Sequence, residues 1–396
     1  MNTRILASLL VTFLIFISCS SDDDGAITPD VSDSKSYSLM SVSNEAITGM
    51  VTFKRNSNNT TTVEVDLDGT TSGMHPAHIH MNTAAESGDI AISLEPINGA
   101  TGMSSTTFST KDDGTPISYE QLLDFNGYVN VHKSADELGI LIAQGDIGQN
   151  ELTGNSKFFT LDSRSNPDII GDVRFLERVN GTTLIEVMLD GTSPNGEHPG
   201  HIHYNTAAEG GDIAVTFTPL RGETGVSKTQ VSKLDNGTAI TYEELLDFNG
   251  YVNIHQSADE LGILIAQGDI GQNELTGDSI VYTLTTIENS GVSGDATFYK
   301  RMNGEALLVI DIMGTMAGDS HPSHLHMGDV DNPGDIVVSL NPVEGETGMS
   351  KTNIAMQDGG SAFGYDDVLS YNGYINVHKS ATELETLLAQ GNIGSN

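Results

Sequence analysis

Short runs of alternating apolar and polar residues, bounded by turn residues, make up most of the chain. Between residues 157 and 270 the runs are KFFTLD, GDVRFLERV, TLIEVMLDG, GHIHYN, DIAVTFTPL, KTQVSKL, GYVNIH and GILIAQGDI. Alternation with a period of two and many β-branched residues is typical of strands with one buried face. About eight such strands in about 120 residues predict an all-β fold, a Greek-key barrel or sandwich.

The pattern recurs three times along the chain. The motif HPxHxH begins at residues 75, 198 and 321, a spacing of 123 residues (198 − 75 and 321 − 198). GYVNVH, GYVNIH and GYINVH, which begin at residues 127, 250 and 373, keep this period. A repeat of this length is long enough to bury a core of its own. We therefore expect three tandem domains, at residues 35–154, 155–277 and 278–396.

One short helix is expected in each domain, and the second domain shows the signal for it. Thr241-Tyr-Glu-Glu244 has the form of a capping box, in which two side chains bond the free backbone N–H groups of a first helical turn. Leu245 and Leu246 follow it and supply apolar side chains for the core. This helix is predicted to begin after Thr241.

The first 18 residues are predicted to be a targeting segment. Arg4 precedes the apolar run LLVTFLIFI, which is too short for a retained membrane span, and Ser18 precedes Cys19. This stretch resembles the lipobox of bacterial lipoproteins, which implies that Cys19 becomes an acylated N-terminus after cleavage. An ordinary secretory signal with an incidental cysteine is the alternative.

Residues 19–34 are predicted to be the acylated cysteine and an acidic tether. The sequence SSDDDGAITPDVSDSKS, which begins at residue 20, is too polar to order itself by burial. Its SSDDDG start resembles the surface-export signal of Bacteroidota lipoproteins, which implies an outer-membrane lipoprotein exposed at the cell surface. A plain acidic linker would instead leave the protein facing the periplasm.

Composition narrows the range of partners. The chain has 17 basic and 54 acidic residues, a formal net charge of −37, and a single cysteine. Phosphate groups bind clustered Lys and Arg, so the charge argues against nucleic acid and anionic membrane surfaces as partners. The lipid anchor is the only membrane contact that we expect. One cysteine cannot form an intramolecular disulfide, so the domains must be stable without one.

Histidine is confined to the repeated motifs. Each repeat has three histidines in HPxHxH and a fourth some fifty residues later, and together these are His75, His78, His80, His132, His198, His201, His203, His255, His321, His324, His326 and His378. The chain has no others. Twelve histidines at fixed positions in three copies indicate a shared role.

Strand alternation predicts where these side chains point. His78 and His80 share one face of their strand. In the later strand Val129 and Val131 point to the core, so His132 points outward. If the two strands are neighbours, three imidazoles converge on the polar outer surface of the barrel. The equivalents of His75, in the turn before the first strand, either join the three or orient them.

The histidine set predicts a metal site with copper or zinc as the ion. Two imidazoles at i and i+2 on a strand can present two nitrogens to one ion, and a third imidazole leaves an open coordination position. All twelve histidines are candidate ligands. A hydrogen-bonded cluster without an ion is the alternative, since surface histidines often only form hydrogen bonds.

Two family resemblances follow from these motifs. AHIH followed by YVNVH resembles the CHRD domain, first described in chordin and also found in microbial exported proteins. That family typically continues with G-E-I-R-G-Q, whereas this chain has GILIAQ at 139–144 and lacks the charged middle. The resemblance extends over all three repeats and implies an architecture more than an activity.

The motif at 75–80 is also similar to the H-x-x-H-x-H of copper/zinc superoxide dismutases. That resemblance implies a superoxide-dismutase-like barrel with His78, His80 and His132 at copper positions. No histidine lies between His80 and His132, and no arginine between residues 81 and 154, so the zinc ligands and a guide for an anionic substrate have no counterpart.

Three functions remain open from the sequence. The first is a surface-anchored, non-enzymatic binding protein with a histidine site for copper or zinc in each domain. The second is a dismutase-like copper redox enzyme that uses the open coordination position. The third is a structural or adhesive spacer whose histidines only form hydrogen bonds.

Overall fold

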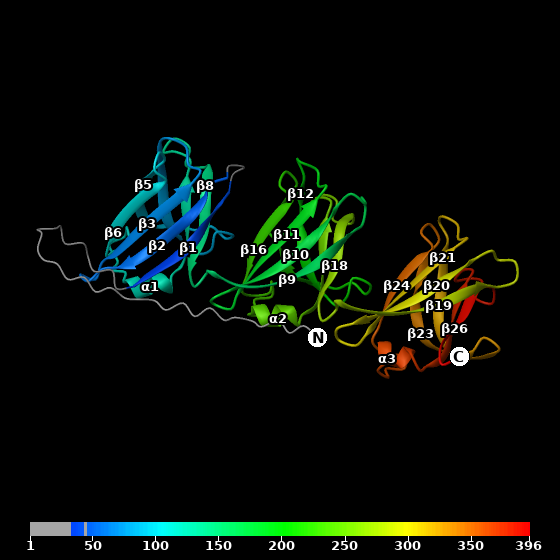
Figure 1. The fold of residues 1–396 in the computed structure, drawn as a ribbon. Helices are drawn as coiled ribbons and strands as arrows, with labels where there is room; N and C mark the ends of the chain where they lie inside the picture. The colour runs from blue at the N-terminus through cyan, green and yellow to red at the C-terminus, as the bar shows by residue number, and fades with distance from the viewer. Residues whose placement is uncertain (1–32, 43–45) are drawn as a thin grey trace, which may run out of the picture.

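A computed structural model describes residues 33–42 and 46–396 (Figure 1). The predicted signal segment, Cys19 and nearly all of the predicted tether lie outside these residues. Within them, no helix has both the length and the apolar character needed to cross a membrane. The described chain is all-β, with three short helices and three sheets that follow one another in a row. The predicted fold class is confirmed.

The first unit is a closed eight-stranded barrel. Its strand order is β1-β2-β3-β6-β5-β4-β7-β8, in which β3 lies beside β6 in a Greek-key arrangement. Its elements are β1 (Ser34–Ser41), β2 (Thr48–Arg55), β3 (Thr61–Asp68), β4 (Met74–Met81), β5 (Ile90–Asn98), β6 (Met103–Phe108), α1 (Tyr119–Leu123), β7 (Asn126–His132) and β8 (Leu141–Gly148).

The third unit is a closed barrel with the corresponding order, β19-β20-β21-β24-β23-β22-β25-β26. Its elements are β19 (Leu275–Thr286), β20 (Ser293–Arg301), β21 (Ala306–Met313), β22 (Ser320–Asp329), β23 (Asn332–Glu344), β24 (Met349–Ile354), α3 (Tyr365–Val368), β25 (Asn372–His378) and β26 (Leu387–Gly394).

The second unit is a curled ten-stranded sheet, so it is not closed as the first and third units are. Two segments that are continuous strands in the first unit are each divided into two short strands here, one at Pro199 and the other between Thr216 and Leu220. Its elements are β9 (Leu152–Ser163), β10 (Ile170–Arg178), β11 (Thr183–Asp190), β12 (Glu197–His198), β13 (Gly200–Tyr204), β14 (Ile213–Thr216), β15 (Leu220–Arg221), β16 (Val226–Val231), α2 (Tyr242–Leu246), β17 (Asn249–His255) and β18 (Leu264–Gly271).

Each unit buries its own apolar cluster, which the alternation along the strands produces. In the first barrel Val51 and Phe53 of β2 are fully buried, as are Ile79 of β4 and Val129 of β7. The residues between them point to the outer face of the sheet. The core therefore fixes which side chains of β4 and β7 face outward.

The predicted helix start is confirmed in the second unit. Thr241 accepts a hydrogen bond from the Glu244 backbone, and the Glu244 carboxylate accepts one from the Thr241 N–H. Ser118 and Gln121 form the same capping box before α1.

Strands β9 and β19 begin directly at the joints between units. Leu152 pairs with Arg178, and Leu275 pairs with Arg301. The Val179 N–H donates to the Glu151 carbonyl across the first joint (2.9 Å). The predicted boundaries 154/155 and 277/278 lie inside these strands, and the exact extents of the domains stay a prediction.

Candidate metal centre

Strands β4 and β7 carry the histidines and are neighbours in the first barrel. Their antiparallel register pairs Ile79 with Val129 and His80 with Tyr128. Because Ile79 and Val129 point into the core, the histidines on either side of them point outward. The neighbouring strands expected from the sequence are therefore present.

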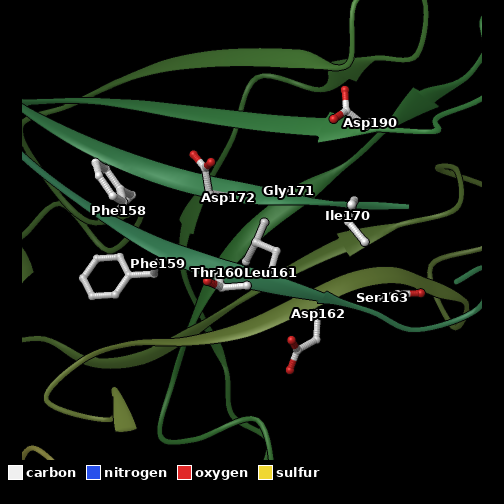
Figure 2. A pocket seen from close by; sticks show the side chains of 10 residues that line it. All are labelled: Phe158, Phe159, Thr160, Leu161, Asp162, Ser163, Ile170, Gly171, Asp172 and Asp190. Carbon is white, nitrogen blue, oxygen red and sulfur yellow. The ribbon is translucent and has the colours of Figure 1, made fainter. Parts of the chain in front are cut away.

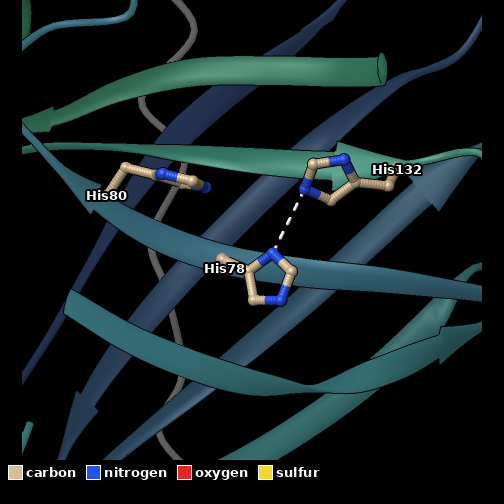
Figure 3. A group of neighbouring side chains, drawn as sticks. All are labelled: His78, His80 and His132. Atoms are coloured by element: carbon tan, nitrogen blue, oxygen red, sulfur yellow. Dashed lines mark hydrogen bonds between the residues drawn. The ribbon is translucent and has the colours of Figure 1, made fainter. Parts of the chain in front are cut away.

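Three imidazoles meet in each unit, and Figure 3 shows the first set. In the described residues, histidine groups with ligand atoms all within 4.8 Å of one another are His78, His80 and His132; His201, His203 and His255; and His324, His326 and His378. In the first set His78 Nδ1 lies 3.1 Å from His132 Nε2. The corresponding distances are 3.2 Å in the second set and 3.0 Å in the third. We call these sets the histidine triads.

Backbone carbonyls decide which nitrogen faces the centre of each triad. His80 Nδ1 lies 2.9 Å from the Gly88 carbonyl oxygen, and His132 Nδ1 lies 2.6 Å from that of Leu138. A carbonyl only accepts, so each Nδ1 must carry the hydrogen and each Nε2 keeps its lone pair. Orientation of this kind by a second hydrogen bond is usual for metal-binding histidines. The same contacts recur at 2.6–3.0 Å in the other two units.

One atom in each triad is buried without a partner. His80 Nε2 has no hydrogen bond, and neither do the Nε2 atoms of His203 and His326. Buried polar atoms are nearly always paired, so a repeated exception indicates a partner that protein atoms do not supply. An ion bound by the three nitrogens would be that partner.

Tyrosine fixes the ring of His80 from its other side. The Tyr128 ring stacks on the His80 ring with 5.0 Å between centroids and an interplanar angle of 18°. The Gly88 N–H donates to the Tyr128 hydroxyl at 3.2 Å. Tyr251 and Tyr374 stack in the same way on the equivalents of His80 in the other units. The ring is therefore held by its strand, a tyrosine and a loop.

Burial lowers the pKa of several triad histidines and so favours their neutral form. Burial, together with the nearby imidazoles of His132 and His80, lowers the pKa of His78. Burial also lowers the pKa of His132, although its hydrogen bond to Leu138 acts in the opposite direction. In the second unit the pKa of His201 is lowered to about 4. Only the neutral form offers a lone pair, so burial favours the form of these histidines that could bind a metal.

A carboxylate lies beside each triad, and the sequence motifs did not point to it. Asp112 accepts hydrogen bonds from the backbone and hydroxyl of Ser93, and its charge partly offsets the lowering of the His78 pKa. Asp235 and Asp358 act in the same way on the equivalents of His78. These aspartates recur at the 123-residue period (235 − 112 and 358 − 235), and that recurrence was the available signal.

Loops cover more of the triads than the sequence suggested. The imidazoles lie on the outer side of the barrel wall, but His80 and His132 are only 9% and 8% exposed. Residues 82–89 and 133–140 supply the bonded carbonyls of Gly88 and Leu138. The triads were expected on the exposed polar surface of the barrel. They are covered instead, because these loops fold back over their own strands.

The structure does not bring His75, His198 and His321 into the triads. His75 is buried, its Nδ1 lies 2.8 Å from the Lys133 carbonyl and its Nε2 lies 3.1 Å from that of Thr71. His198 and His321 make the same contact through Nδ1, but each has a buried Nε2 without a partner. These three histidines link the HPxHxH strand to the chain just beyond the fourth histidine.

Two hollows lie apart from the triads. One, of about 410 Å³, lies along β9 and β10 of the second unit and is lined by residues such as Phe158, Thr160 and Ile170 (Figure 2). The other, of about 1140 Å³, lies between the second and third units. Neither is lined by a histidine.

Comparison with known proteins gives one match. The CHRD domain family model matches residues 34–140, which include His75, His78, His80 and His132. No curated protein and no solved structure matches the chain. The first barrel therefore contains a CHRD domain, and CHRD domains in the second and third units stay a prediction.

Proposed function

We propose that the protein is a non-enzymatic metal-binding protein with one copper or zinc site in each of its three units. The observation that supports this most is the buried, unpartnered Nε2 of His80, which faces the other two imidazoles of its triad. Three converging imidazole nitrogens, two of them on rings that backbone carbonyls orient, are a suitable donor set for either ion.

The donor set narrows the choice of ion. Each triad offers imidazole nitrogens alone, without a thiolate or a carboxylate among its three members. Calcium and magnesium prefer oxygen ligands, so they fit poorly. Copper and zinc both accept imidazole, and three ligands leave room for water or a further ligand.

A dismutase-like copper enzyme is the second candidate, because three imidazoles leave a coordination position open. We rank it lower, since residues 81–154 contain no arginine to guide an anionic substrate toward the first triad. A superoxide assay on the copper-loaded protein separates the two. Activity no greater than that of free copper would exclude the enzyme.

We also propose that acylation of Cys19 anchors the protein to the outer membrane with its domains at the cell surface. The proposal rests on the lipobox-like sequence before Cys19 and on the SSDDDG segment after it. Loss of the lipid in Cys19→Ala, measured by mass spectrometry, tests the anchor. Digestion of the protein by protease added to intact cells tests the surface location, and full protection would place it in the periplasm.

Metal analysis of the purified mature protein tests the main proposal. At saturating copper or zinc we expect three equivalents, and two in each of the single variants His132→Ala, His255→Ala and His378→Ala. His75→Ala is the matched control: it removes a buried histidine outside the triads, so it should lower stability and keep three equivalents in the folded protein. Fewer than one equivalent in the parent protein would refute metal binding. The spacer function would then remain.

A further inference from the structure

The joints between units contain arginines that are completely buried. Arg178 in β10 is 0% exposed, and its Nη1 donates to the Asp146 carboxylate of the first unit at 2.8 Å. The same Nη1 donates to the Asn150 carbonyl, and Nε donates to Gln230 at 2.6 Å. A buried charge is tolerated only with such partners, so Arg178 fixes the parts of the first unit that it contacts.

Asp146 and Asn150, which Arg178 contacts, also bond the loop that covers the first triad. The second oxygen of Asp146 accepts the Ala84 N–H at 2.8 Å, and the Asn150 amide donates to the Asn82 carbonyl at 2.9 Å. Both contacts are in residues 82–89, the loop whose Gly88 carbonyl orients His80. Two short hydrogen-bonded paths thus lead from an arginine of the second unit to a metal-facing histidine of the first.

The second joint repeats these contacts to the covering loop with equivalent residues. Arg301 is fully buried and donates to Asp269 at 2.8 Å. Asp269 accepts the Ala207 N–H at 2.8 Å, and Asn273 donates to the Asn205 carbonyl at 2.7 Å. That loop supplies the Gly211 carbonyl, which orients His203 at 2.9 Å.

Two other positions of the chain show what happens without this contact between an aspartate and an arginine of the next unit. In the third unit Asn392 takes the place of Asp146 and accepts the Val330 N–H at 3.0 Å, with no arginine bonded to it among the described residues. In the first unit the equivalent arginine, Arg55, is not in a joint of the described chain. It pairs with Glu120 and Asp33, and its side chain is 39% exposed.

We propose that Arg178 and Arg301 are positioning residues for the metal sites of the preceding units, so that each of the first two sites is completed by the next unit. This inference rests on the proposed metal binding. Arg178 anchors residues 82–89, and the anchored loop holds the Gly88 carbonyl where it sets the tautomer and the ring direction of His80. Loss of such an outer partner typically weakens metal affinity about 10- to 100-fold.

The test uses the full mature chain with only the first site active. His201→Ala and His324→Ala disable the other two triads, and these two side chains are chosen because each hydrogen-bonds another triad histidine rather than a covering loop. Copper affinity is measured by chelator competition, and the copper(II) resonance spectrum reports the ligand geometry. In this background Arg178→Gln should bind copper about tenfold more weakly and change the spectrum. The matched control Arg55→Gln should change neither.

Asp146→Ala is a second variant in case Arg178→Gln does not fold, because it breaks the same ion pair from the side of the first unit. It should weaken binding in the same direction, and the effects of the two substitutions should not add. Unchanged affinity and spectrum in a folded Arg178→Gln or Asp146→Ala protein would overturn the positioning role, and so would an equal loss in Arg55→Gln. Metal binding itself would survive either result. If the parent background binds no metal, the proposed function fails instead.

Discussion

Two imidazoles of the first triad take their direction from a backbone carbonyl bonded to the far nitrogen. His80 and His132 donate through Nδ1 to carbonyls and so present Nε2 to the triad, whereas His78 presents Nδ1 directly. The nitrogens that could bind an ion in this triad are thus one Nδ1 and two Nε2 atoms. His75, with both nitrogens directed at carbonyls, has none left for an ion. In the first unit, backbone carbonyls thus separate His75 from the three candidate ligands.

The hydroxyl of Tyr128 should matter for metal affinity beyond its effect on stability. Tyr128→Phe keeps the ring stacked on His80 but removes the acceptor of the Gly88 N–H. Tyr37→Phe is the matched control, because Tyr37 is a buried tyrosine of the same barrel that hydrogen-bonds the Gly148 backbone. We expect each variant to lose about 1 kcal/mol in denaturant unfolding. Only Tyr128→Phe should lose zinc affinity in calorimetry, and equal affinities would contradict this role.

Protonation of the triads should make the metal-free protein less stable in mild acid. Burial, with His255 and His203 nearby, lowers the pKa of His201 from 6.5 to about 4. Between those values the unfolded chain binds a proton that the folded chain does not, so stability falls as pH falls from about 6.5 to about 4. Urea midpoints measured with a chelator across this range should show the loss. His201→Ala should flatten the dependence, and identical curves would count against this origin.

At the level of secondary structure, alternation along β4 and β7 was enough to predict which histidines share a face. Ile79 and Val129 fix the inner side, and a period of two then fixes the outer one. The meeting of the two strands follows from the Greek-key order, which places β4 between β5 and β7. The sequence predicted that the imidazoles converge if the two strands are neighbours, and in the barrel the two strands are neighbours.

Other parts of the site could not be predicted from the types of residue in the sequence. The carbonyls of Gly88 and Leu138 are backbone atoms, so their role depends on how two loops fold back over the strands. Asp112 is 34 residues from His78 (112 − 78), and it bonds Ser93 of β5, the residue paired with His78. Contacts of this kind are set by tertiary packing, which periodicity does not describe.

Gly88 should be essential to the shape of the loop that covers the first triad. A Cβ at this position would lie 2.0 Å from the Met81 carbonyl oxygen, so the backbone must move. We expect Gly88→Ala to cost about 1–3 kcal/mol of stability and to weaken metal binding, because the carbonyl that orients His80 moves with it.

Gly139→Ala is the control for this prediction. Gly139 lies in the other covering loop and has no positive φ, and a Cβ added there would have no other atom within 4 Å. Its stability and metal affinity should stay at parent values. Equal behaviour of the two alanine variants in thermal melts and metal titrations would refute the special role of Gly88.

For the whole molecule, the 123-residue period was enough to predict three similar units, but not how they join. Arg178 and Asp146 are far apart in sequence and belong to different units, so nothing in either repeat marks them as partners. The third repeat has Asn392 where the first has Asp146. In the described residues, Asp146 and Asp269 each pair with a buried arginine of the following unit, whereas Asn392 bonds the Val330 N–H and no arginine.

The buried arginines should also limit movement between units. Arg301 bonds Asp269 and the Asn273 carbonyl across the second joint, and losing one partner of a buried ion pair typically costs about 3–5 kcal/mol when the other stays buried. In Arg301→Gln the joint can avoid that cost by opening, which returns Asp269 to water. We therefore expect the second and third units to sample a wider range of relative positions.

Distances between two spin labels measure this range directly. Lys228 in the second unit and Met356 in the third are 57% and 58% exposed, so cysteines there can be labelled in a Cys19→Ser background. The distance distribution should be narrow in the parent protein and broader in Arg301→Gln. Arg55→Gln, which removes the equivalent side chain away from any joint of the described chain, should leave it narrow. A distribution unchanged by Arg301→Gln would mean that the backbone contacts at β19 hold the joint without the arginine.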